Sequence, residues 1–302
     1  MIDLALPDLH RHLDGSLRGS TLRELAQGAG LEVPADLAFH PAMGLTDALS
    51  RFAFTLSVLQ EATAVRRIAS EMCEDAAAEG VTTLEVRFAP QLHLQHGARI
   101  PEIVDAALEG LDGRAGLILC GLYGEPVTML DALVECATSR KGVVGIDLAG
   151  GPTPLHAIRL ADYAAPFVRA ADAGIGRTVH AGEGRPAAEI RTAVEQLQAQ
   201  RIGHGTTLLD DPDVVDLVLA RGIVIEACPT SNVHTGAIRT VAEHPLPRWL
   251  ALGVRACICS DNTLLSAVDS AAEHRHARAM PGMDDRLLAR AIATGHAAAF
   301  AR

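Results

Sequence analysis

The chain has 302 residues, 49% of them hydrophobic and 21% charged, a composition that suits a globular protein and excludes a disordered or fibrous one. Acidic residues outnumber lysine and arginine by 37 to 26, and the formal net charge of −11 disfavours binding to nucleic acid or to an anionic membrane. With 2 Tyr, 1 Trp and 6 Phe, few aromatic rings are available for base stacking, so a small polar substrate fits better.

The first residues, MIDLALPDLHRHLDG, lack the basic segment and long apolar run of a secretory signal. No later stretch is apolar for long enough to span a bilayer, so we expect a cytoplasmic protein that does not enter a membrane. The six cysteines form no CxxC pair and lie mostly in apolar segments, which predicts reduced, buried thiols. The sequence leaves the oligomeric state open.

Short apolar segments rich in β-branched residues alternate with helical patterns along the chain. Strands are expected at 6–12, 81–88, 117–123, 143–149, 177–182, 201–204, 223–229 and 255–260. Apolar residues at three- and four-residue spacing predict helices at 63–79, 100–111, 128–138, 155–173, 187–198, 213–221 and 244–252. Eight strands separated by helices predict an α/β fold, a (β/α)8 TIM barrel in a single domain over 1–302. A doubly wound sheet is disfavoured because neither GxGxxG nor GxxxxGK[ST] occurs.

One long segment interrupts the alternation between the first and second strands. Residues 16–80 include the apolar and aromatic run LSRFAFTLSVLQ. An insertion after the first strand lies over the mouth of the barrel where the active site forms, so we expect a helical insertion that acts as a lid.

Polar residues stand at the carboxyl ends of several otherwise apolar strands. His10 and His12 are two residues apart on the first strand and therefore point to the same face. His180, His204 and Asp261 end later strands, in the segments TVHAGE, RIGHG and CICSD. Because a barrel collects its catalytic groups at this end, we expect these side chains to meet.

Imidazole and carboxylate ligands suit Zn²⁺, and a catalytic zinc site keeps one position open for water. Binding lowers the pKa of that water toward about 7, which predicts hydrolytic chemistry. A two-metal site bridged by a carboxylated lysine would need a lysine at a strand's carboxyl end. The one lysine, Lys141, precedes the fourth strand, so we expect a single Zn²⁺ per chain.

A set of sequence blocks spans the chain from end to end. The blocks are LHRHLDGS (9–16), LEVRFAP (84–90), GIDLAG (145–150), HAGE (180–183), RIGHG (201–205), ACPTSN (227–232) and SDN (260–262). In order and spacing this set resembles the adenosine deaminase family of the amidohydrolase superfamily. Each block alone is weak, but the set as a whole is specific.

The resemblance implies roles for the polar residues. Glu183 matches the glutamate that donates a proton to purine N1, and His204 matches the histidine that holds and deprotonates the attacking water. The implied metal ligands are His10, His12, His180 and Asp261. Loss of ammonia from an aromatic amidine requires protonation of the adjacent ring nitrogen, so Glu183 must be protonated when substrate binds, and we expect burial beside the purine to raise its pKa. On the residues alone, a helix-capping glutamate and a core histidine are the alternatives.

The resemblance also implies a purine-nucleoside pocket. Gly150 matches the glycine whose backbone contacts the purine, and Asp14 matches the aspartate that binds a ribose hydroxyl, although an Asp-Gly turn is the alternative for Asp14. Phe52 and Phe54 lie in the segment that covers the ribose. Asn262 replaces the more usual second aspartate, and its amide is expected to donate to purine N7 without needing protonation.

These matches predict the zinc-dependent deamination of adenosine and 2′-deoxyadenosine to inosine and ammonia in purine metabolism. The alternative is another 6-aminopurine: a 5′-modified adenosine such as aminofutalosine, free adenine, or an N6-substituted adenine. A different class, a non-catalytic barrel that binds nucleosides, is disfavoured because no expected ligand or proton donor is missing.

Overall fold

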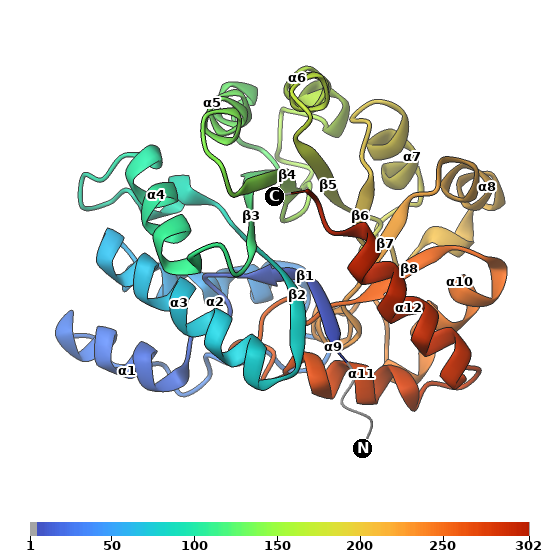
Figure 1. Ribbon diagram of the computed structural model, residues 1–302, viewed down its shortest axis with the longest axis horizontal. Coiled ribbons are helices and arrows are strands. Elements are labelled where there is room, and N and C mark those ends of the chain that lie inside the picture. The colour runs from blue at the N-terminus through green and yellow to red at the C-terminus, as the bar shows by residue number, and fades with distance from the viewer. Residues whose placement is uncertain (1–4, 302) are drawn as a thin grey trace.

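The computed structural model describes residues 5–301, in which parallel strands form a barrel surrounded by helices (Figure 1). The strands follow one another around the barrel in chain order: β1 (Leu6–His12), β2 (Val81–Phe88), β3 (Gly116–Leu122), β4 (Val143–Ala149), β5 (Gly176–Ala181), β6 (Arg201–His204), β7 (Val224–Ala227) and β8 (Arg255–Ile258). The predicted (β/α)8 fold is confirmed, and each of the eight strands lies within two residues of its expected bounds.

The barrel closes between β1 and the segment that follows β8. Arg11 pairs with Asp261 in a parallel bridge. The backbone N–H of His12 donates to the carbonyl of Asp261 at 2.8 Å, and the N–H of Asp261 donates to the carbonyl of His10 at 2.8 Å. This closure brings the first and last predicted metal-ligand segments side by side.

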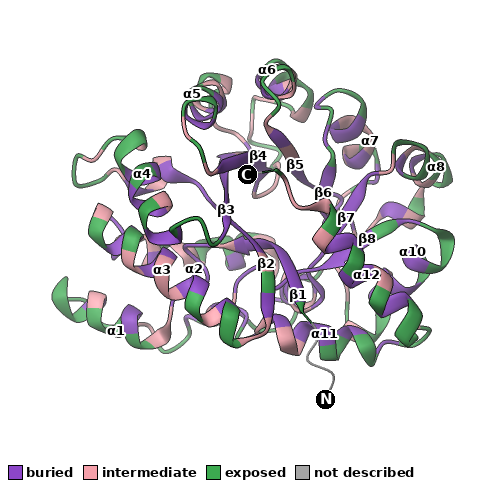
Figure 2. Cartoon of the chain, in the orientation of Figure 1, coloured by how far each residue is buried: buried purple, intermediate pink, exposed green. Residues whose placement is uncertain are grey.

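Helices cover the outside of the barrel, and their outer faces are exposed while the strands are buried (Figure 2). After β2 they are α4 (Ile100–Leu111), α5 (Val127–Thr138), α6 (Ala164–Asp172), α7 (Ala188–Glu195), α8 (Pro212–Arg221), α9 (Pro229–His234), α10 (Leu246–Leu252), α11 (Ser270–Arg278) and α12 (Asp285–Ala298). Short 3₁₀ turns are η1 (Pro90–His93), η2 (Leu160–Tyr163), η3 (Leu208–Asp210) and η4 (Val241–Glu243).

Local sequence explains where these helices begin and end. The Asp211 side chain accepts from the backbone N–H groups of Asp213 and Val214, Pro212 occupies the first turn of α8, and Gly222 ends the helix in the left-handed conformation. Helix α12 packs against β8 and β1, the strands between which the barrel closes.

The expected insertion between β1 and β2 contains three helices: α1 (Gly19–Gly28), α2 (Leu45–Ser57) and α3 (Ala62–Ala78). Helix α3 packs along α4 and against β2, so it belongs to the outer ring of the barrel. Helix α2 instead contributes side chains to the cavity at the carboxyl ends of the strands, as a lid requires.

Two parts of the chain differ from the sequence-based expectation. The helix predicted at 155–173 begins late, because residues 151–159 form an irregular loop and only η2 and α6 are helical. The backbone N–H of His156 donates to the carbonyl of Thr153 at 3.1 Å, so the chain makes a turn at the start of this segment instead of a helix. The sequence patterns also missed α11 and α12, which close the chain after β8.

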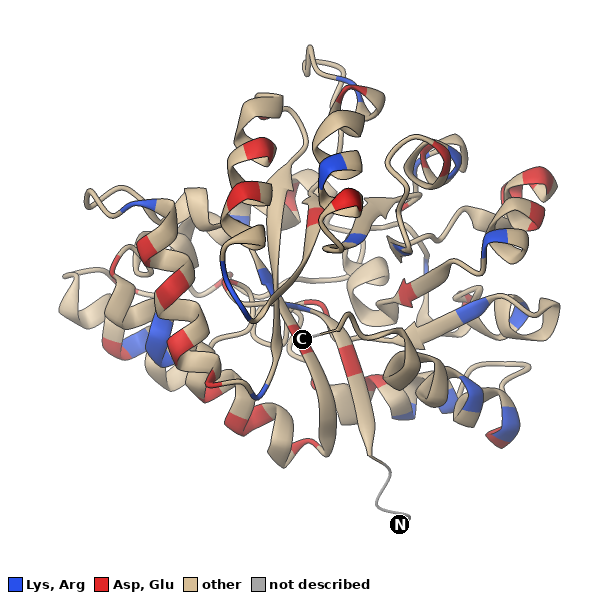
Figure 3. Ribbon diagram, turned by 45° about the horizontal axis from the view of Figure 1, so that its top comes forward, with Lys and Arg blue, Asp and Glu red and all other residues tan. Residues whose placement is uncertain are grey.

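Charged residues of both signs are mixed over the outer helices, and some lie on the strands (Figure 3). All six cysteines are buried, as expected, and the described residues contain no disulfide. Within residues 5–301, no helix has the length and apolar character needed to cross a bilayer.

Candidate metal and active site

Three histidines point their ring nitrogens at one another at the carboxyl end of the barrel. The Nε2 atoms of His10 and His180 lie 3.1 Å apart, and Nε2 of His12 lies 3.3 Å from each of them. Oδ1 of Asp261 lies 3.5 Å from Nε2 of His12 and 3.8 Å from Nε2 of His10. The structure therefore brings together the four residues expected to hold a metal.

Buried carboxylates fix the orientation of two of these rings. Nδ1 of His10 lies 2.7 Å from Oε2 of Glu226, and Nδ1 of His180 lies 3.0 Å from Oδ2 of Asp147. Arg87 bridges the two carboxylates, with its guanidinium nitrogens 2.9 Å from Asp147 and 2.8 Å from Glu226. Because each Nδ1 donates its proton to a carboxylate, the facing Nε2 atoms of His10 and His180 carry lone pairs.

This donor set fits a divalent cation. Unprotonated nitrogens that face each other at such distances repel unless a cation lies between them. Ligands bound tetrahedrally at zinc–nitrogen distances stand about 3.3 Å from one another, close to the separations among His10, His12 and His180. Burial lowers the pKa of His10 and of His12 well below the ordinary value, which keeps both rings neutral, as metal ligation requires, whereas for His180 the nearby Asp147 carboxylate outweighs burial and raises the pKa.

The backbone is strained at two of the strand ends. His204 and Asp261 have φ values of 68° and 61°, in the left-handed region that residues other than glycine rarely adopt.

A Cβ added at Gly203 would lie 2.9 Å from Cε1 of His10. The absence of a side chain at Gly203 therefore makes room for the His10 ring, rather than for water or substrate at His204.

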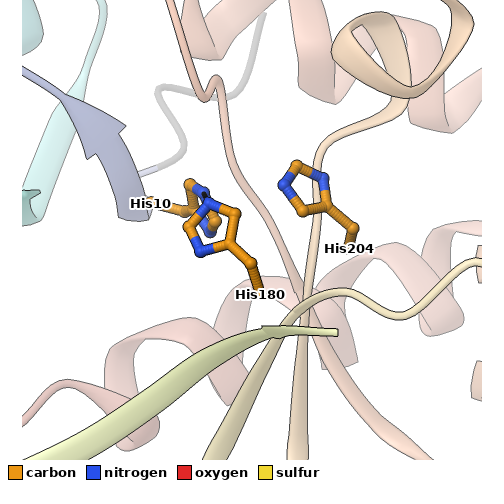
Figure 4. Close-up of side chains that lie close together, drawn as sticks. All are labelled: His10, His180 and His204. Carbon is orange, nitrogen blue, oxygen red and sulfur yellow. Dashed lines mark hydrogen bonds between the residues drawn. The ribbon is translucent and has the colours of Figure 1, made fainter. Parts of the chain in front are cut away.

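His204 lies beside the three-histidine cluster, with its ring centroid 5.0 Å from those of His10 and His180. In Figure 4 one ring nitrogen of His204 faces His10 and His180 while the other faces away. Ring nitrogens of these three residues lie within 4.8 Å of one another. Nε2 of His12 lies 3.3 Å from Nε2 of His10 and of His180. His12, rather than His204, therefore completes the compact set of three histidines.

Glu183 is buried next to His204 and receives several polar contacts. Its Oε1 accepts from the hydroxyl of Thr235 at 2.9 Å, and its Oε2 lies 3.9 Å from Nη1 of Arg185. Burial raises the pKa of Glu183, but His204 and Arg185 oppose this effect and the net pKa lies below the ordinary value. The described site therefore favours the carboxylate, and the rise in the pKa of Glu183 that is expected beside a bound purine stays a prediction.

A cavity of about 390 Å³ opens beside these groups. Its lining includes three of the metal-site residues, both candidate catalytic residues, and the expected substrate contacts Asp14, Gly150, Phe52 and Asn262. Gly150 adopts a φ of 75°, a conformation that glycine tolerates. Burial raises the pKa of Asp14 to about 7, and its Oδ1 has no hydrogen-bond partner within the described part of the chain.

The two expected phenylalanines are placed differently. Phe52 lines the cavity from α2, with its ring edge-on to His12 at a centroid distance of 6.4 Å. Both rings pack against the hydrophobic core, but Phe54 is not among the residues that line the cavity. Residues two apart on a helix point in very different directions, which explains why only Phe52 reaches the cavity.

Asn262 is buried at the cavity, but its amide nitrogen donates to Oδ1 of Asp261 at 2.7 Å. One hydrogen of the amide is thus used by a candidate metal ligand, and the second is the one available for the expected donation to a purine. The Oδ1 atom of Asn262 also lies against Gly15. A Cβ added at Gly15 would be 1.9 Å from this oxygen.

Several residues of the site received no role from the sequence. Asp147 and Glu226 support the histidines, Thr235 contacts Glu183, and Asn232 donates to Nδ1 of His204 at 2.9 Å. A signal existed for Asp147 and Glu226, since an acidic residue within a short apolar strand is buried and requires a partner. Asn232 stands within the block ACPTSN, whose individual positions gave no assignment.

Comparison with known proteins gives consistent results. A family model described as adenosine deaminase matches residues 6–302. The chain is 37% identical over 276 residues to an adenosine deaminase of Enterococcus faecalis, a match that covers 86% of this chain and 81% of that protein.

Two solved structures are similar over nearly the whole chain. The adenine deaminase of Arthrobacter aurescens has a TM-score of 0.88 and 26% identity, covering 98% of this chain and 94% of that one. The Arabidopsis N6-mAMP deaminase has a TM-score of 0.88 and 25% identity, covering 99% and 93%.

Proposed function

The chain belongs to the adenosine deaminase family and is a hydrolase that acts on a carbon–nitrogen bond, and we propose that it converts adenosine and 2′-deoxyadenosine to inosine or 2′-deoxyinosine and ammonia. The observation that carries the proposal is the convergence of His10, His12, His180 and Asp261 beside a buried glutamate and a cavity. We assign this activity to one barrel domain over 1–302, with one Zn²⁺ per chain, in cytoplasmic purine metabolism.

In this proposal His10, His12, His180 and Asp261 hold the metal. When bound, a zinc ion lowers the pKa of a water molecule and so supplies a nucleophile at neutral pH. His204 holds the attacking water next to the amino-bearing carbon. Glu183 holds a proton at purine N1, which prevents negative charge from accumulating in the ring as aromaticity is lost.

The low pKa of Glu183 in the described site adds a condition to this assignment. The carboxyl must take up its proton when the purine binds, because the ring removes water from Glu183 and further desolvation raises its pKa. Thr235 keeps Oε1 oriented by donating to it, which leaves the second oxygen available to the substrate.

A nucleoside fits the cavity better than a nucleotide. Neither lysine nor arginine is among the described residues that line it, and the nearby Arg185 already pairs with Glu189 at 2.8 Å, which disfavours pairing with a phosphate. Asp14 instead offers a buried carboxyl oxygen without a partner, which suits a ribose hydroxyl. Phe52 covers this region from α2.

A 5′-modified adenosine is the second candidate. Leu49 lines the cavity although it is 43% exposed, so it stands at the mouth, and Leu45, Leu56 and Leu92 also line the cavity. Leucine side chains there would accommodate an uncharged 5′ substituent better than a charged one. Adenine and N6-substituted adenines complete the set of 6-aminopurines to be compared.

The test is ammonia release from a panel of 6-aminopurines by the purified zinc-loaded protein. The panel contains adenosine, 2′-deoxyadenosine, adenine, AMP, 5′-modified adenosines and N6-substituted adenines. We expect the highest kcat/KM for adenosine and 2′-deoxyadenosine and little turnover of AMP. Preference for AMP, or no ammonia from any member, would contradict the proposal.

A further inference from the structure

Behind His204 lies a pair of buried residues that the proposed chemistry does not use. Asn232 on α9 is fully buried, and His244, which follows η4, is 3% exposed. The Asn232 amide lies between two imidazoles: its Nδ2 is 2.9 Å from Nδ1 of His204, and its Oδ1 is 3.3 Å from Nε2 of His244. The His244 ring also packs edge-on against Trp249 at a centroid distance of 5.3 Å.

A backbone amide fixes the proton on His244. The N–H of Leu246 donates to Nδ1 of His244 at 3.1 Å, so this nitrogen must carry a lone pair. Burial lowers the pKa of His244 to about 3, so the ring is neutral and its one proton is on Nε2. Nε2 of His244 therefore donates, and the Asn232 atom that faces it must be the amide oxygen.

The orientation of Asn232 then fixes the proton on His204. With Oδ1 accepting from His244, Nδ2 is the atom that faces His204, and an NH₂ group only donates. Nδ1 of His204 must therefore accept. The second hydrogen of the amide points toward Oε1 of Glu183, 3.5 Å away, so the same side chain contacts both candidate catalytic residues.

We infer that Asn232 and His244 are positioning residues that place the single ring proton of His204 on Nε2, the nitrogen that faces the metal-site histidines. This inference rests on the proposed function and deepens it. In that tautomer His204 holds the attacking water by donating a hydrogen bond to its oxygen. An Nε2 that already carries a proton does not accept another, so the water's proton goes to a carboxylate of the site, in contrast to the expected role of His204 as base.

The tautomer is measured directly by nitrogen NMR of the zinc-loaded protein with ¹⁵N-labelled histidine. The His204 signals are identified by their loss in His204→Gln. We expect the chemical shift of an unprotonated nitrogen at Nδ1 and that of a protonated nitrogen at Nε2. The opposite assignment overturns the inference whatever the activity of the protein, so its failure is distinguishable from failure of the proposed function.

Asn232→Asp tests whether His204 donates a hydrogen bond to the attacking water or acts as the base that takes its proton. An aspartate has nearly the same shape but only accepts, so it draws the His204 proton to Nδ1 and leaves Nε2 bare. We expect the NMR assignment to reverse and kcat for adenosine to fall at least about 10²-fold with KM changed much less, as for loss of a donor to the reacting oxygen. An unchanged or higher kcat, which a base would give, overturns the inference.

His244 is tested by a conservative and a disruptive change. His244→Gln keeps an N–H donor for Asn232 and should retain most of the kcat, whereas His244→Phe removes the donor and should lower kcat. The matched control is His93→Phe, since His93 is also buried and contacts an aromatic ring, Phe88, at a centroid distance of 5.5 Å. Equal losses of kcat in His244→Phe and His93→Phe would reduce His244 to a packing role and overturn its assignment.

Discussion

Nδ1 of His10 lies 2.7 Å from Oε2 of Glu226, and both side chains are completely buried inside the barrel. The same carboxylate oxygen is 2.8 Å from Nη2 of Arg87, so it accepts from both an imidazole and a guanidinium. These contacts hold the His10 ring with Nε2 directed at His12 and His180. The arrangement of these candidate metal ligands is thus set from within the barrel, by residues that contact the histidine rings.

Replacing Glu226 tests this support. Glu226→Gln is expected to weaken zinc binding by about 10- to 100-fold, because the amide no longer fixes the donating Nδ1 of His10. Zinc content by elemental analysis should be about one per wild-type chain, and affinity is measured by competition with a chelator whose excess abolishes turnover. Glu273→Gln is the matched control, since Glu273 is equally buried and contacts Thr230 and His276 instead of a metal-site histidine. Equal loss of affinity in both variants would refute the assignment.

Glu183→Gln isolates proton delivery. The amide preserves size and accepts from Thr235 as the carboxylate does, but it has no acidic proton to give to purine N1. We expect kcat to fall at least about 10²-fold while zinc content and melting temperature stay close to those of the wild type. A kcat within a few fold of the wild type would remove Glu183 from the mechanism.

Phe52 and Phe54 form an internal comparison on α2. Phe52→Ala removes a ring that both lines the cavity and packs on the core, so KM for adenosine should rise and the melting temperature should also fall. Phe54→Ala removes a ring packed on the core, so it should lower the melting temperature with a smaller effect on KM. The two variants are compared by steady-state kinetics and by calorimetry. A larger rise in KM for Phe54→Ala would show that Phe54 reaches the substrate.

The fold was predictable because every barrel strand is a short apolar run that ends in glycine or polar residues. Strands at 6–12, 81–88, 143–149 and 201–204 have the expected bounds. The helix expected at 155–173 was too long because its apolar spacing continued through residues 155–159, which belong to an irregular loop. Helix α11 reads as polar all round, with Glu273, His274, Arg275 and His276 in succession, so periodicity gave no signal for it.

The residues of the candidate site could be predicted where a polar side chain stands at the carboxyl end of a strand. His10, His12, His180 and Asp261 followed from their places along the chain and from the resemblance, and the barrel brings them together. The tautomer of His204 was not predictable, since it depends on Asn232 and His244, which lie 28 and 40 residues further along the chain. Contacts between loops of this kind carry no periodic pattern.

Asp14 gives the protein a distinctive pH dependence of stability. Burial, together with the negative charge of Asp261, raises the pKa of Asp14 to about 7 in the folded state, against about 3.9 when unfolded. The folded state therefore binds the proton more tightly. The stability that this proton contributes is complete below the unfolded pKa and is lost as pH rises through about 7.

The difference between the wild type and Asp14→Asn measures this contribution. Asparagine does not titrate, so the free energy of unfolding of the wild type should fall relative to the variant between pH 5 and 8, by at most about 1.4 kcal/mol per pH unit. Chemical denaturation at a series of pH values gives the difference. A constant difference across this range would mean that Asp14 ionises normally in the folded protein.

Asp14→Ala addresses substrate binding through the same side chain. If the carboxylate accepts a hydrogen bond from a ribose hydroxyl, its loss should reduce kcat/KM for adenosine by about 10- to 150-fold, corresponding to about 1.5–3 kcal/mol for a charge-assisted hydrogen bond. Adenine, which has no ribose, should be much less affected. The assay is best run at pH 8, above the raised pKa, where the wild-type carboxyl is ionised.

Comparison with 5′-deoxyadenosine identifies the hydroxyl and separates binding from loop structure. The wild type should already turn over 5′-deoxyadenosine poorly, and Asp14→Ala should reduce that activity little further, because the partner of the carboxylate is absent from this substrate. Asp14 precedes Gly15, whose backbone carbonyl accepts from Leu264 and Leu265, so a turn-forming role would affect the cavity as a whole. In that case the mutation would lower kcat/KM equally for both nucleosides and lower the melting temperature, and Asp14 would be assigned to the turn instead of to the ribose.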